Sequence, residues 1–362
     1  MAKDTGLWEE IISTEGKKVQ WEELRTFVKQ LFVAYGVPEG EAFTVADCLV
    51  TGELSGVESH GVVLVPLYIR RILDGGNNPV MNISVLSEHP ATLHLHANAS
   101  MGMPASEYAM QRAISKAREV GSAVVVARGM NHYGMAAYYT EMAAKADMVG
   151  ISFTNAQPCI APIGSATPYF GTNPISFAVP THGDPIMLDM AASVVAMGKV
   201  TLAARIGAPI PEGWAITREG EPTTDAALGA KGSVLPMGGH KGAALGIMVD
   251  ILSGILSGGR FGPQIPDMLL DTGAQQDIGA FFCAIDISKF VGIDTFKACT
   301  EQMSAEIRAL PKMPGVERIY MPGEKEHSRR QERKQRGINL PTQTYQPLAQ
   351  LGAEKGLNLP TH

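Results

Sequence analysis

Three short apolar runs that follow one another closely constrain the fold of this chain more than any other feature. They cover residues 149–154, 175–179 and 186–190, and each has the length and composition of a β-strand. The connections between them hold no helical pattern, whereas parallel neighbouring strands need a long crossover, usually a helix. The sequence therefore predicts an α/β protein with a mixed, partly antiparallel sheet, and not a doubly wound parallel sheet.

Other periodic segments predict helices and strands on both sides of these runs. Residues 21–35 carry apolar side chains at helical spacing, and Gly36 and Pro38 end the pattern. Pro66 is tolerable only in the first turn of the helix that contains it. Further helices are expected at 39–54, 63–73, 108–120, 135–146, 242–256 and 295–310, and further strands at 91–97, 123–127 and 280–285.

The change of pattern along the chain predicts three regions. Residues 1–80 are expected to form an α-helical domain, because the segments there are amphipathic helices without strands. Residues 81–315 mix strands and helices and form the expected cofactor- and substrate-binding region. Residues 316–362 are a charged tail that we expect to pack on the helical domain.

Composition and charge favour an ordinary globular protein. Of 362 residues, 45% are hydrophobic and 18% are charged, and the formal net charge is -6. Such a charge gives no general attraction to nucleic acid or to an anionic membrane. The one dense basic run, 325–336, is expected to be a solvated helix or tail, with contact to an anionic cofactor as the alternative.

The N-terminus lacks the apolar core of a signal peptide, and no stretch approaches the ~20 apolar residues that span a bilayer. We therefore expect a cytoplasmic protein with neither nucleic acid nor membrane among its partners.

The spacing of cysteine and histidine predicts no metal centre. His94 and His96 alternate with leucines, so they share one face of a predicted strand. Two solvent-facing histidines are expected there; a metal site is the alternative, but no acidic or cysteine partner lies nearby. Four cysteines, far apart and without a C-x-x-C pair, are expected to be reduced and buried: Cys48, Cys159, Cys283 and Cys299.

The common nucleotide-binding signatures are missing. The chain has neither G-x-G-x-x-G after a strand nor the P-loop pattern G-x-x-x-x-G-K-[ST]. Residues 238–242 surround Lys241 with glycines just before a predicted helix. Backbone N–H groups and one cation could bind a phosphate there, and a plain helix start is the alternative.

Two histidines lie in glycine-rich settings, His60 in residues 59–61 and His132 in residues 131–134. A histidine can give or take a proton near neutral pH, and glycine lets the backbone approach a substrate closely. Neither G-x-S-x-G nor H-E-x-x-H is present, which removes the commonest serine hydrolase and zinc protease hypotheses. Acid/base chemistry by histidine remains.

Several sequence motifs, taken together, resemble those of one known enzyme family. Six of them, in order, resemble those of the type 2 malate/L-lactate dehydrogenase family: 52–68 (GELSGVESHGVVLVPLY), 131–134 (NHYG), 171–174 (GTNP), 188–191 (LDMA), 197–199 (MGK) and 235–242 (LPMGGHKG). The match extends from about residue 21 to about residue 340. The family includes ureidoglycolate dehydrogenase, diketogulonate reductase, sulfolactate dehydrogenase and cyclic-imine carboxylate reductases.

The resemblance implies an oxidoreductase that uses NAD or NADP, with a non-Rossmann cofactor-binding fold and a homodimeric or dimer-based assembly. Hydride would pass between nicotinamide and a small 2-hydroxy or 2-oxo acid such as malate, lactate or ureidoglycolate. His60 is then the expected proton donor or acceptor, with Ser59 beside it, and His132 is a second catalytic histidine. Substrate contacts are expected from Tyr68, Thr172 and Asn173, and cofactor contacts from Ile186, Met187, Leu188, Asp189, Met190, Ala191, His240, Lys241, Gly323, Glu324 and Lys325.

One position departs from the family pattern. Many members have an arginine four residues after the Ser-His-Gly histidine, where a guanidinium could clamp a substrate carboxylate, and this chain has Leu64. Either Arg70, Arg71 or Lys199 takes that role, or the substrate is less polar at that end. Two alternative functions stay open: a cyclic-imine carboxylate reductase, and a non-catalytic metabolite-binding paralogue.

Overall fold

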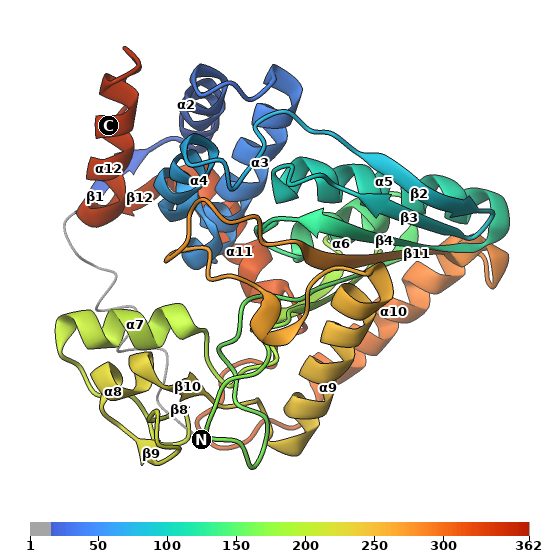
Figure 1. Ribbon diagram of the computed structural model, residues 1–362. Helices are drawn as coiled ribbons and strands as arrows, with labels where there is room; N and C mark the ends of the chain where they lie inside the picture. The colour runs from blue at the N-terminus through green and yellow to red at the C-terminus, as the bar shows by residue number, and fades with distance from the viewer. Residues whose placement is uncertain (1–15, 362) are drawn as a thin grey trace. The chain divides into compact units, whose positions relative to one another are not determined.

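The computed structural model describes residues 16–361 and divides into two compact units (Figure 1). The first unit holds residues up to Asp74 together with those from Lys325 onward, and the second holds Gly75–Glu324. Within residues 16–361, no helix combines the length and the apolar character that crossing a membrane requires.

The first unit is mainly helical. Its N-terminal part contains α2 (Trp21–Ala34), α3 (Glu39–Ser55) and α4 (Val65–Leu73), and its C-terminal part α11 (Glu324–Arg336) and α12 (Thr342–Ala353). The amphipathic pattern of α2 is confirmed, because its buried side chains are the apolar ones: Leu24, Phe27, Val28, Leu31 and Phe32. Helix α2 thereby contributes an apolar stripe to the core of this unit.

A short antiparallel ladder joins the two ends of this unit. Strand β1 (Gly16–Val19) pairs with β12 (Ile338–Pro341), with Val19 opposite Ile338. The C-terminal segment therefore belongs to the same unit as the N-terminal helices, although the sequence between them forms the other unit.

The second unit is built on a seven-stranded sheet in the order β2-β3-β4-β11-β5-β6-β7. Only β3 and β4 are parallel, and every other neighbouring pair is antiparallel. The predicted mixed, partly antiparallel sheet is therefore confirmed. The strands are β2 (Ser84–His89), β3 (Thr92–His96), β4 (Ser122–Met130), β5 (Met148–Thr154), β6 (Ile175–Val179), β7 (Ile186–Met190) and β11 (Ile278–Asp286).

Helices α5 (Gly102–Val120) and α6 (Ala137–Lys145) share one hydrophobic core with this sheet. Small side chains of α5, such as Ala109 and Ala113, let the helix lie close to the strands, and Tyr139 of α6 stacks on Tyr133 with ring centroids 5.1 Å apart. Helix α9 (His240–Asp250) continues as one π-turn, η3 (Ile251–Ile255), which contacts β11.

The remaining helices of the second unit are α7 (Met197–Ile206), α8 (Ala226–Lys231) and α10 (Ile293–Ala309). A small antiparallel sheet in the order β10-β8-β9 lies between α7 and α9 in the chain and consists of β8 (Ala215–Ile216), β9 (Pro222–Thr223) and β10 (Ser233–Val234).

Several predictions about local structure were wrong or incomplete. Helix α5 begins at Gly102 and not at 108, and the predicted helix 242–256 begins at His240 and ends in the π-turn. Strand β2 was missed because all six of its residues are exposed, which removes the alternation that marks a half-buried strand. Among the cysteines, Cys299 is exposed rather than buried and Cys159 is half-buried.

Candidate functional site

The Ser59-His60 motif forms a tight turn in the first unit. It lies in a single 3₁₀ turn, η1 (Glu58–His60), which Gly61 connects to a second, η2 (Val62–Leu64), directly before α4. Pro66 stands in the first turn of α4, where its missing N–H has no helical partner to lose.

Ser59 and His60 interact with each other within this turn. The Ser59 hydroxyl Oγ lies 3.0 Å from Nδ1 of the His60 ring. Burial lowers the pKa of His60, because desolvation disfavours the charged imidazolium. The arrangement thus presents a histidine oriented by Ser59, and its burial favours the neutral ring.

Residues that the sequence did not single out hold this turn in place. The carboxyl group of Glu53 and the guanidinium of Arg333 both bond to it, and neither belongs to a recognisable catalytic motif. Their signal in the sequence is weak, since an acidic residue near a helix C-terminus and an arginine in a basic run are usually solvated.

The predicted substrate residue Tyr68 lies on α4 with its side chain buried. Desolvation raises the pKa of its phenol well above the ordinary value. The electrostatic interaction with Cys48 also raises this pKa, and that with Arg71 lowers it. Arg71 is only 1% exposed, whereas Arg70 is exposed and pairs with Asp74 at 2.6 Å. Of these two arginines, Arg71 is thus the one held inside the unit beside Tyr68.

His132 lies in the loop between β4 and α6 of the second unit. Its backbone N–H donates to Oε1 of Gln276 at 3.1 Å, and Nδ2 of Asn131 donates to the carbonyl of Ala99 at 2.9 Å. A side chain at Gly102 would collide with the carbonyl oxygens of Asn131 and His132, so α5 packs backbone to backbone against this loop. Gln276, which is buried, was not found from the sequence because no motif surrounds it.

The predicted cofactor stretch 186–191 covers β7 and the residue after it. Asp189 is opposite Ser176 in the ladder, and its Oδ2 accepts a hydrogen bond from the backbone N–H of Ala137 at 2.8 Å. Ala137 opens α6, so the Asp189 carboxylate satisfies one of the unpaired donors at that helix start. The strand is thereby tied to the loop that carries His132.

The turn 171–174 is fastened to its neighbours through Asn173. This residue has φ +41°, is buried, and uses both ends of its amide: Oδ1 accepts from the N–H of Ala156 at 3.2 Å, and Nδ2 donates to the carbonyl of Gly246 at 2.8 Å. The carbonyl of Thr172 accepts from the N–H of Ala192 at 2.7 Å. Asn173 therefore connects the turn to α9.

The glycine-rich segment before α9 supplies an open helix start. Gly238 and Gly239 have φ +58° and +66°, a conformation that other residues rarely adopt, and α9 begins at His240. His240 and Lys241 are both exposed. The N–H of Met237 donates to the carbonyl of Ala192 at 2.9 Å, so this segment, the turn 171–174 and the end of β7 are hydrogen-bonded together.

The segment 321–324 joins β7 from a distant part of the sequence. The N–H of Met187 donates to the carbonyl of Pro322 at 3.1 Å, and a side chain at Gly323 would crowd Met187. Glu324 accepts from the N–H of Met321 at 3.0 Å and pairs with Arg308 and Arg318. Lys325, the next predicted cofactor residue, begins the part of the chain assigned to the first unit and is exposed.

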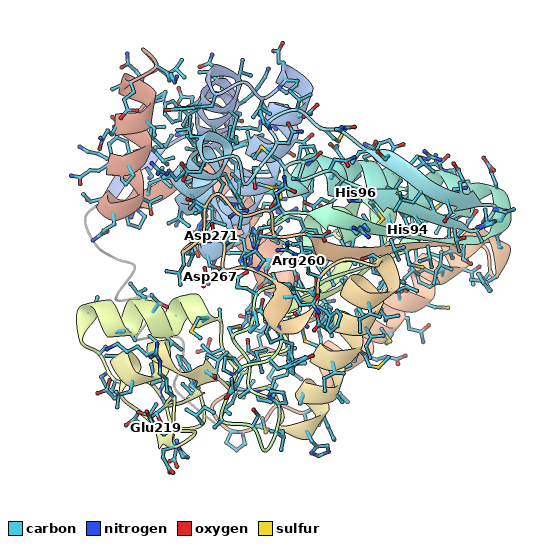
Figure 2. The ribbon with its side chains drawn as sticks, viewed as in Figure 1. His94, His96, Glu219, Arg260, Asp267 and Asp271 are labelled. Atoms are coloured by element: carbon cyan, nitrogen blue, oxygen red, sulfur yellow. The ribbon has the colours of Figure 1, made fainter. Side chains whose placement is uncertain are left out.

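His94 and His96 on β3 are labelled in Figure 2 together with four charged residues of the same unit. Nε2 of His94 lies 2.8 Å from the carbonyl of Ser257, and Nδ1 of His96 accepts from the N–H of Asn98 at 2.9 Å. Both histidines are half-buried, so the predicted solvent-facing pair is only partly correct. Across residues 16–361, no group of three or more His, Cys, Asp or Glu side chains could hold a metal ion.

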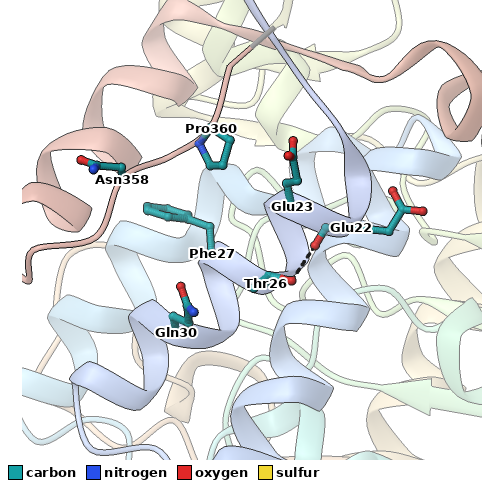
Figure 3. Close-up of a pocket in the computed structure, with 7 residues that line it drawn as sticks. All are labelled: Glu22, Glu23, Thr26, Phe27, Gln30, Asn358 and Pro360. Carbon is teal, nitrogen blue, oxygen red and sulfur yellow. Dashed lines mark hydrogen bonds between the residues drawn. The ribbon is translucent and has the colours of Figure 1, made fainter.

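A pocket of about 220 Å³ opens on α2 of the first unit (Figure 3). Two carboxylates line it, and the Thr26 hydroxyl next to them donates to the carbonyl of Glu22 at 2.8 Å. None of the predicted site residues lines this pocket. Its full lining is Glu22, Glu23, Thr26, Phe27, Gln30, Asn358 and Pro360.

Comparison with known proteins decides the family. Residues 19–349 match the sequence model of the malate/L-lactate dehydrogenase family. The chain belongs to the malate/L-lactate dehydrogenase family. It is 40% identical over 348 residues to malate dehydrogenase of Pyrococcus horikoshii, covering 94% of this chain and 96% of that protein. It is 35% identical over 332 residues to ureidoglycolate dehydrogenase (NAD(+)) of Escherichia coli, covering 91% of this chain and 95% of that protein.

Solved structures of this dehydrogenase family share the fold. Malate dehydrogenase from Entamoeba histolytica superimposes with a TM-score of 0.92 at 31% identity, covering 96% of this chain and 100% of that one. Δ1-Piperideine-2-carboxylate reductase from Pseudomonas syringae superimposes with a TM-score of 0.82 at 28% identity, covering 92% and 99%. The resemblance drawn from the motifs and the non-Rossmann fold class are therefore confirmed.

The protein is thus an oxidoreductase of the malate/L-lactate dehydrogenase family, as the motifs predicted. Relatives carry names that specify NAD(+) in one case and NADP(+) in another, which agrees with the two cofactors expected from the sequence.

Proposed function

We propose that this protein transfers hydride reversibly between NAD or NADP and a small 2-hydroxy or 2-oxo acid, with His60 as the proton donor and acceptor. The observation that carries the proposal is the oriented, half-buried His60 ring, whose Nδ1 lies 3.0 Å from the Ser59 hydroxyl. Family membership makes hydride transfer the chemistry that such a histidine would serve.

Two features of the second unit support our proposal for the cofactor site. The start of α9 offers backbone donors and the exposed Lys241 to a diphosphate, and the missing side chain at Gly323 lets that segment lie close against Met187 of β7. We propose that 186–191, His240, Lys241 and 323–325 contact the cofactor. When bound, the nicotinamide supplies the hydride donor or acceptor that no side chain can provide.

The contribution of His60 follows from the charge that the reaction creates. As a carbonyl carbon accepts hydride, negative charge develops on its oxygen, and an imidazolium can transfer a proton to that oxygen. In the oxidation direction the neutral ring takes the hydroxyl proton. Ser59 would orient the ring, and His132, whose backbone is held by Gln276, is proposed as a second catalytic histidine.

We propose that Tyr68, Thr172 and Asn173 contribute to substrate binding, but not all by direct contact. The amide of Asn173 already bonds to Ala156 and Gly246, which favours a positioning role for that residue over direct contact. Leu64 offers no charge, so the malate-like dicarboxylates are less favoured than a monocarboxylate such as lactate or pyruvate unless another cation substitutes.

A second candidate is reduction of a cyclic imine carboxylate. It is favoured by the structural similarity to Δ1-piperideine-2-carboxylate reductase. An imine nitrogen is already protonated in the reactive form, so replacement of His60 would then reduce turnover much less.

We also propose a cytoplasmic homodimer. Apolar side chains that a second copy could cover lie along α9 and η3, where Leu245, Ile247, Met248, Ile251 and Ile255 are exposed. Sedimentation velocity of the purified protein tests the assembly, and a single monomeric species would contradict it.

Loss of NADH and NADPH absorbance measures the activity, with pyruvate, oxaloacetate, sulfopyruvate, ureido acids, diketogulonate and piperideine carboxylate as substrates. Turnover with at least one acid, undiminished after dialysis against EDTA, supports the proposal. Absence of binding of both NADH and NADPH in a fluorescence titration would refute it, and would favour a metabolite-binding paralogue. Loss of activity with EDTA would contradict only the metal-independent mechanism.

A further inference from the structure

Glu53 is an acidic side chain enclosed in the first unit. It lies in the last turns of α3, next to the turn that carries His60, and only 2% of the residue is exposed. Burying a carboxyl group costs free energy unless hydrogen bonds compensate, so acidic residues are rarely fully buried. The carboxyl group of Glu53 should therefore form compensating hydrogen bonds with the groups around it.

Its contacts go to the backbone of the His60 turn. Oε1 of Glu53 accepts a hydrogen bond from the N–H of Val62 at 2.9 Å. A Cβ atom at Gly61 would collide with the Glu53 carboxyl group, so a larger residue there would force that carboxyl group to move. A Cβ atom at Gly52 would lie 3.0 Å from the carbonyl oxygen of His60. The last turns of α3 thus approach the turn at His60, Gly61 and Val62.

Arg333 of α11 holds the opposite end of the same turn. Its Nη2 donates to Oε1 of Glu58 at 2.6 Å, and its Nη1 donates to the backbone carbonyl of Glu53. Arg330 on the same helix donates to the Ser55 hydroxyl at 3.1 Å. Glu58 begins η1 and Val62 begins η2, so the turn is anchored two residues before His60 and two residues after it.

We propose that Glu53 is a positioning residue for His60, which acts by accepting the Val62 N–H and fixing the backbone of residues 60–62. This inference rests on the proposed role of His60 in proton transfer. Glu53 exchanges no proton with the substrate in this scheme. The turn requires a side-chain oxygen at the distance of a glutamate carboxyl group, packed against Gly61, that can accept the Val62 N–H. This oxygen can be charged or uncharged.

Two substitutions of Glu53 separate the role of its oxygen acceptor from the role of its volume. Glu53→Gln keeps an oxygen acceptor of the same length, and Glu53→Leu removes it at similar volume. Thr44→Val is a matched control, because Thr44 is another buried polar residue of α3 whose hydroxyl bonds within the helix, to Gly40 at 3.3 Å. The measurements are kcat, the KM of the cofactor, and the NMR titration of the His60 ring.

For Glu53→Leu we expect kcat to fall by at least about tenfold, since displacement of a catalytic group by about 1 Å can cost up to about 100-fold. The KM of the cofactor should change less than about twofold, because the substitution removes no contact with the bound cofactor in this proposal. The His60 titration should move toward the ordinary histidine value as the ring leaves its position. Glu53→Gln and Thr44→Val should retain kcat and the wild-type titration.

Several results would overturn the inference. Wild-type kcat in Glu53→Leu, or an equal loss in Glu53→Gln, would show that the acceptor is not what positions His60. If Glu53→Leu does not fold, Gly61→Ala serves instead, because its methyl group displaces the same carboxyl group; an unchanged His60 titration there would contradict the proposal. The titration requires no turnover, so a protein without dehydrogenase activity would refute the proposed function and still leave the Glu53 contact measurable.

Discussion

The carboxyl group of Glu53 accepts the backbone N–H of Val62 at 2.9 Å, two residues beyond the histidine proposed as the proton donor. This relationship joins the end of α3 to the turn between η1 and η2. The position of His60 therefore depends on a buried hydrogen bond that lies outside the Ser-His-Gly motif itself.

Replacement of His60 by asparagine should lower kcat by about 10²–10⁴-fold, the usual contribution of a general acid or base. Cofactor binding should remain, because the proton donor acts in the transition state. Steady-state kinetics and a fluorescence titration with NADH measure the two effects. His132→Asn is the companion variant: if it is inactive while His60→Asn turns over normally, the principal acid is His132.

The lowered pKa of His60 predicts opposite pH profiles for the two directions of the reaction. Reduction needs the imidazolium, so its kcat/KM should fall as pH rises through a value below the ordinary 6.5. Oxidation needs the neutral ring and should rise over the same range. Measurement of kcat/KM from about pH 5 to about pH 9 in both directions tests this expectation. The pH-dependent change assigned to His60 should be absent in His60→Asn. A reduction limb well above pH 7 would point to another acid.

Glu53 should make the folded state less stable as pH rises. Burial, and next the charge of Glu58, raise the pKa of Glu53 from its ordinary 4.5 to about 8, while the Val62 N–H and Arg333 lower it. Between these two values the folded state binds the proton and the unfolded state releases it, so stability is full below about 4.5 and falls until about 8.

The variant Glu53→Gln removes this titration. Urea denaturation at a series of pH values should show a wild-type loss of at most about 1.4 kcal/mol per pH unit relative to Glu53→Gln. His60 acts in the opposite sense below 6.5, and taking the difference between the two proteins cancels that contribution. Parallel stability curves for the two proteins would mean that Glu53 is ionised when folded.

Replacement of Leu64 by arginine should increase activity toward dicarboxylates. A bidentate contact with a carboxylate is worth about 1.5–3 kcal/mol, which corresponds to about tenfold to a hundredfold in kcat/KM. The measurement is the ratio of kcat/KM for oxaloacetate to that for pyruvate, in wild type and in Leu64→Arg. An unchanged ratio would mean that another cation already holds the carboxylate, with buried Arg71 beside Tyr68 as the first candidate to test.

Replacement of Asn173 by alanine should destabilise the second unit. It leaves the Ala156 N–H and the Gly246 carbonyl without their partner and places alanine at φ +41°, which together should cost about 2–4 kcal/mol. Urea denaturation measures this loss, and Asn358→Ala, at an exposed asparagine, should change stability by less than about 0.5 kcal/mol. Full stability with lost activity would instead favour direct substrate contact by Asn173.

Local pattern was sufficient for much of the fold and for the family. The amphipathic spacing in α2 and the closely spaced apolar runs of β5, β6 and β7 predicted those elements, because side-chain periodicity follows directly from helix and strand geometry. Exposed β2 and Pro-containing α12 lack such a pattern, so they were missed. The glycine-rich motifs in turn identified the family and the segments around His60 and His132.

What only the tertiary structure decided is how these segments are held. Glu53 and Arg333, 280 positions apart, meet at the His60 turn, and Gln276 meets the backbone of His132 from 144 positions away. No local pattern predicts such pairs, since a hydrogen bond across a long loop depends on packing that involves the whole unit. The sequence by itself therefore determined the family and the motifs that we propose to carry the reaction, and folding decided which buried groups hold those motifs in place.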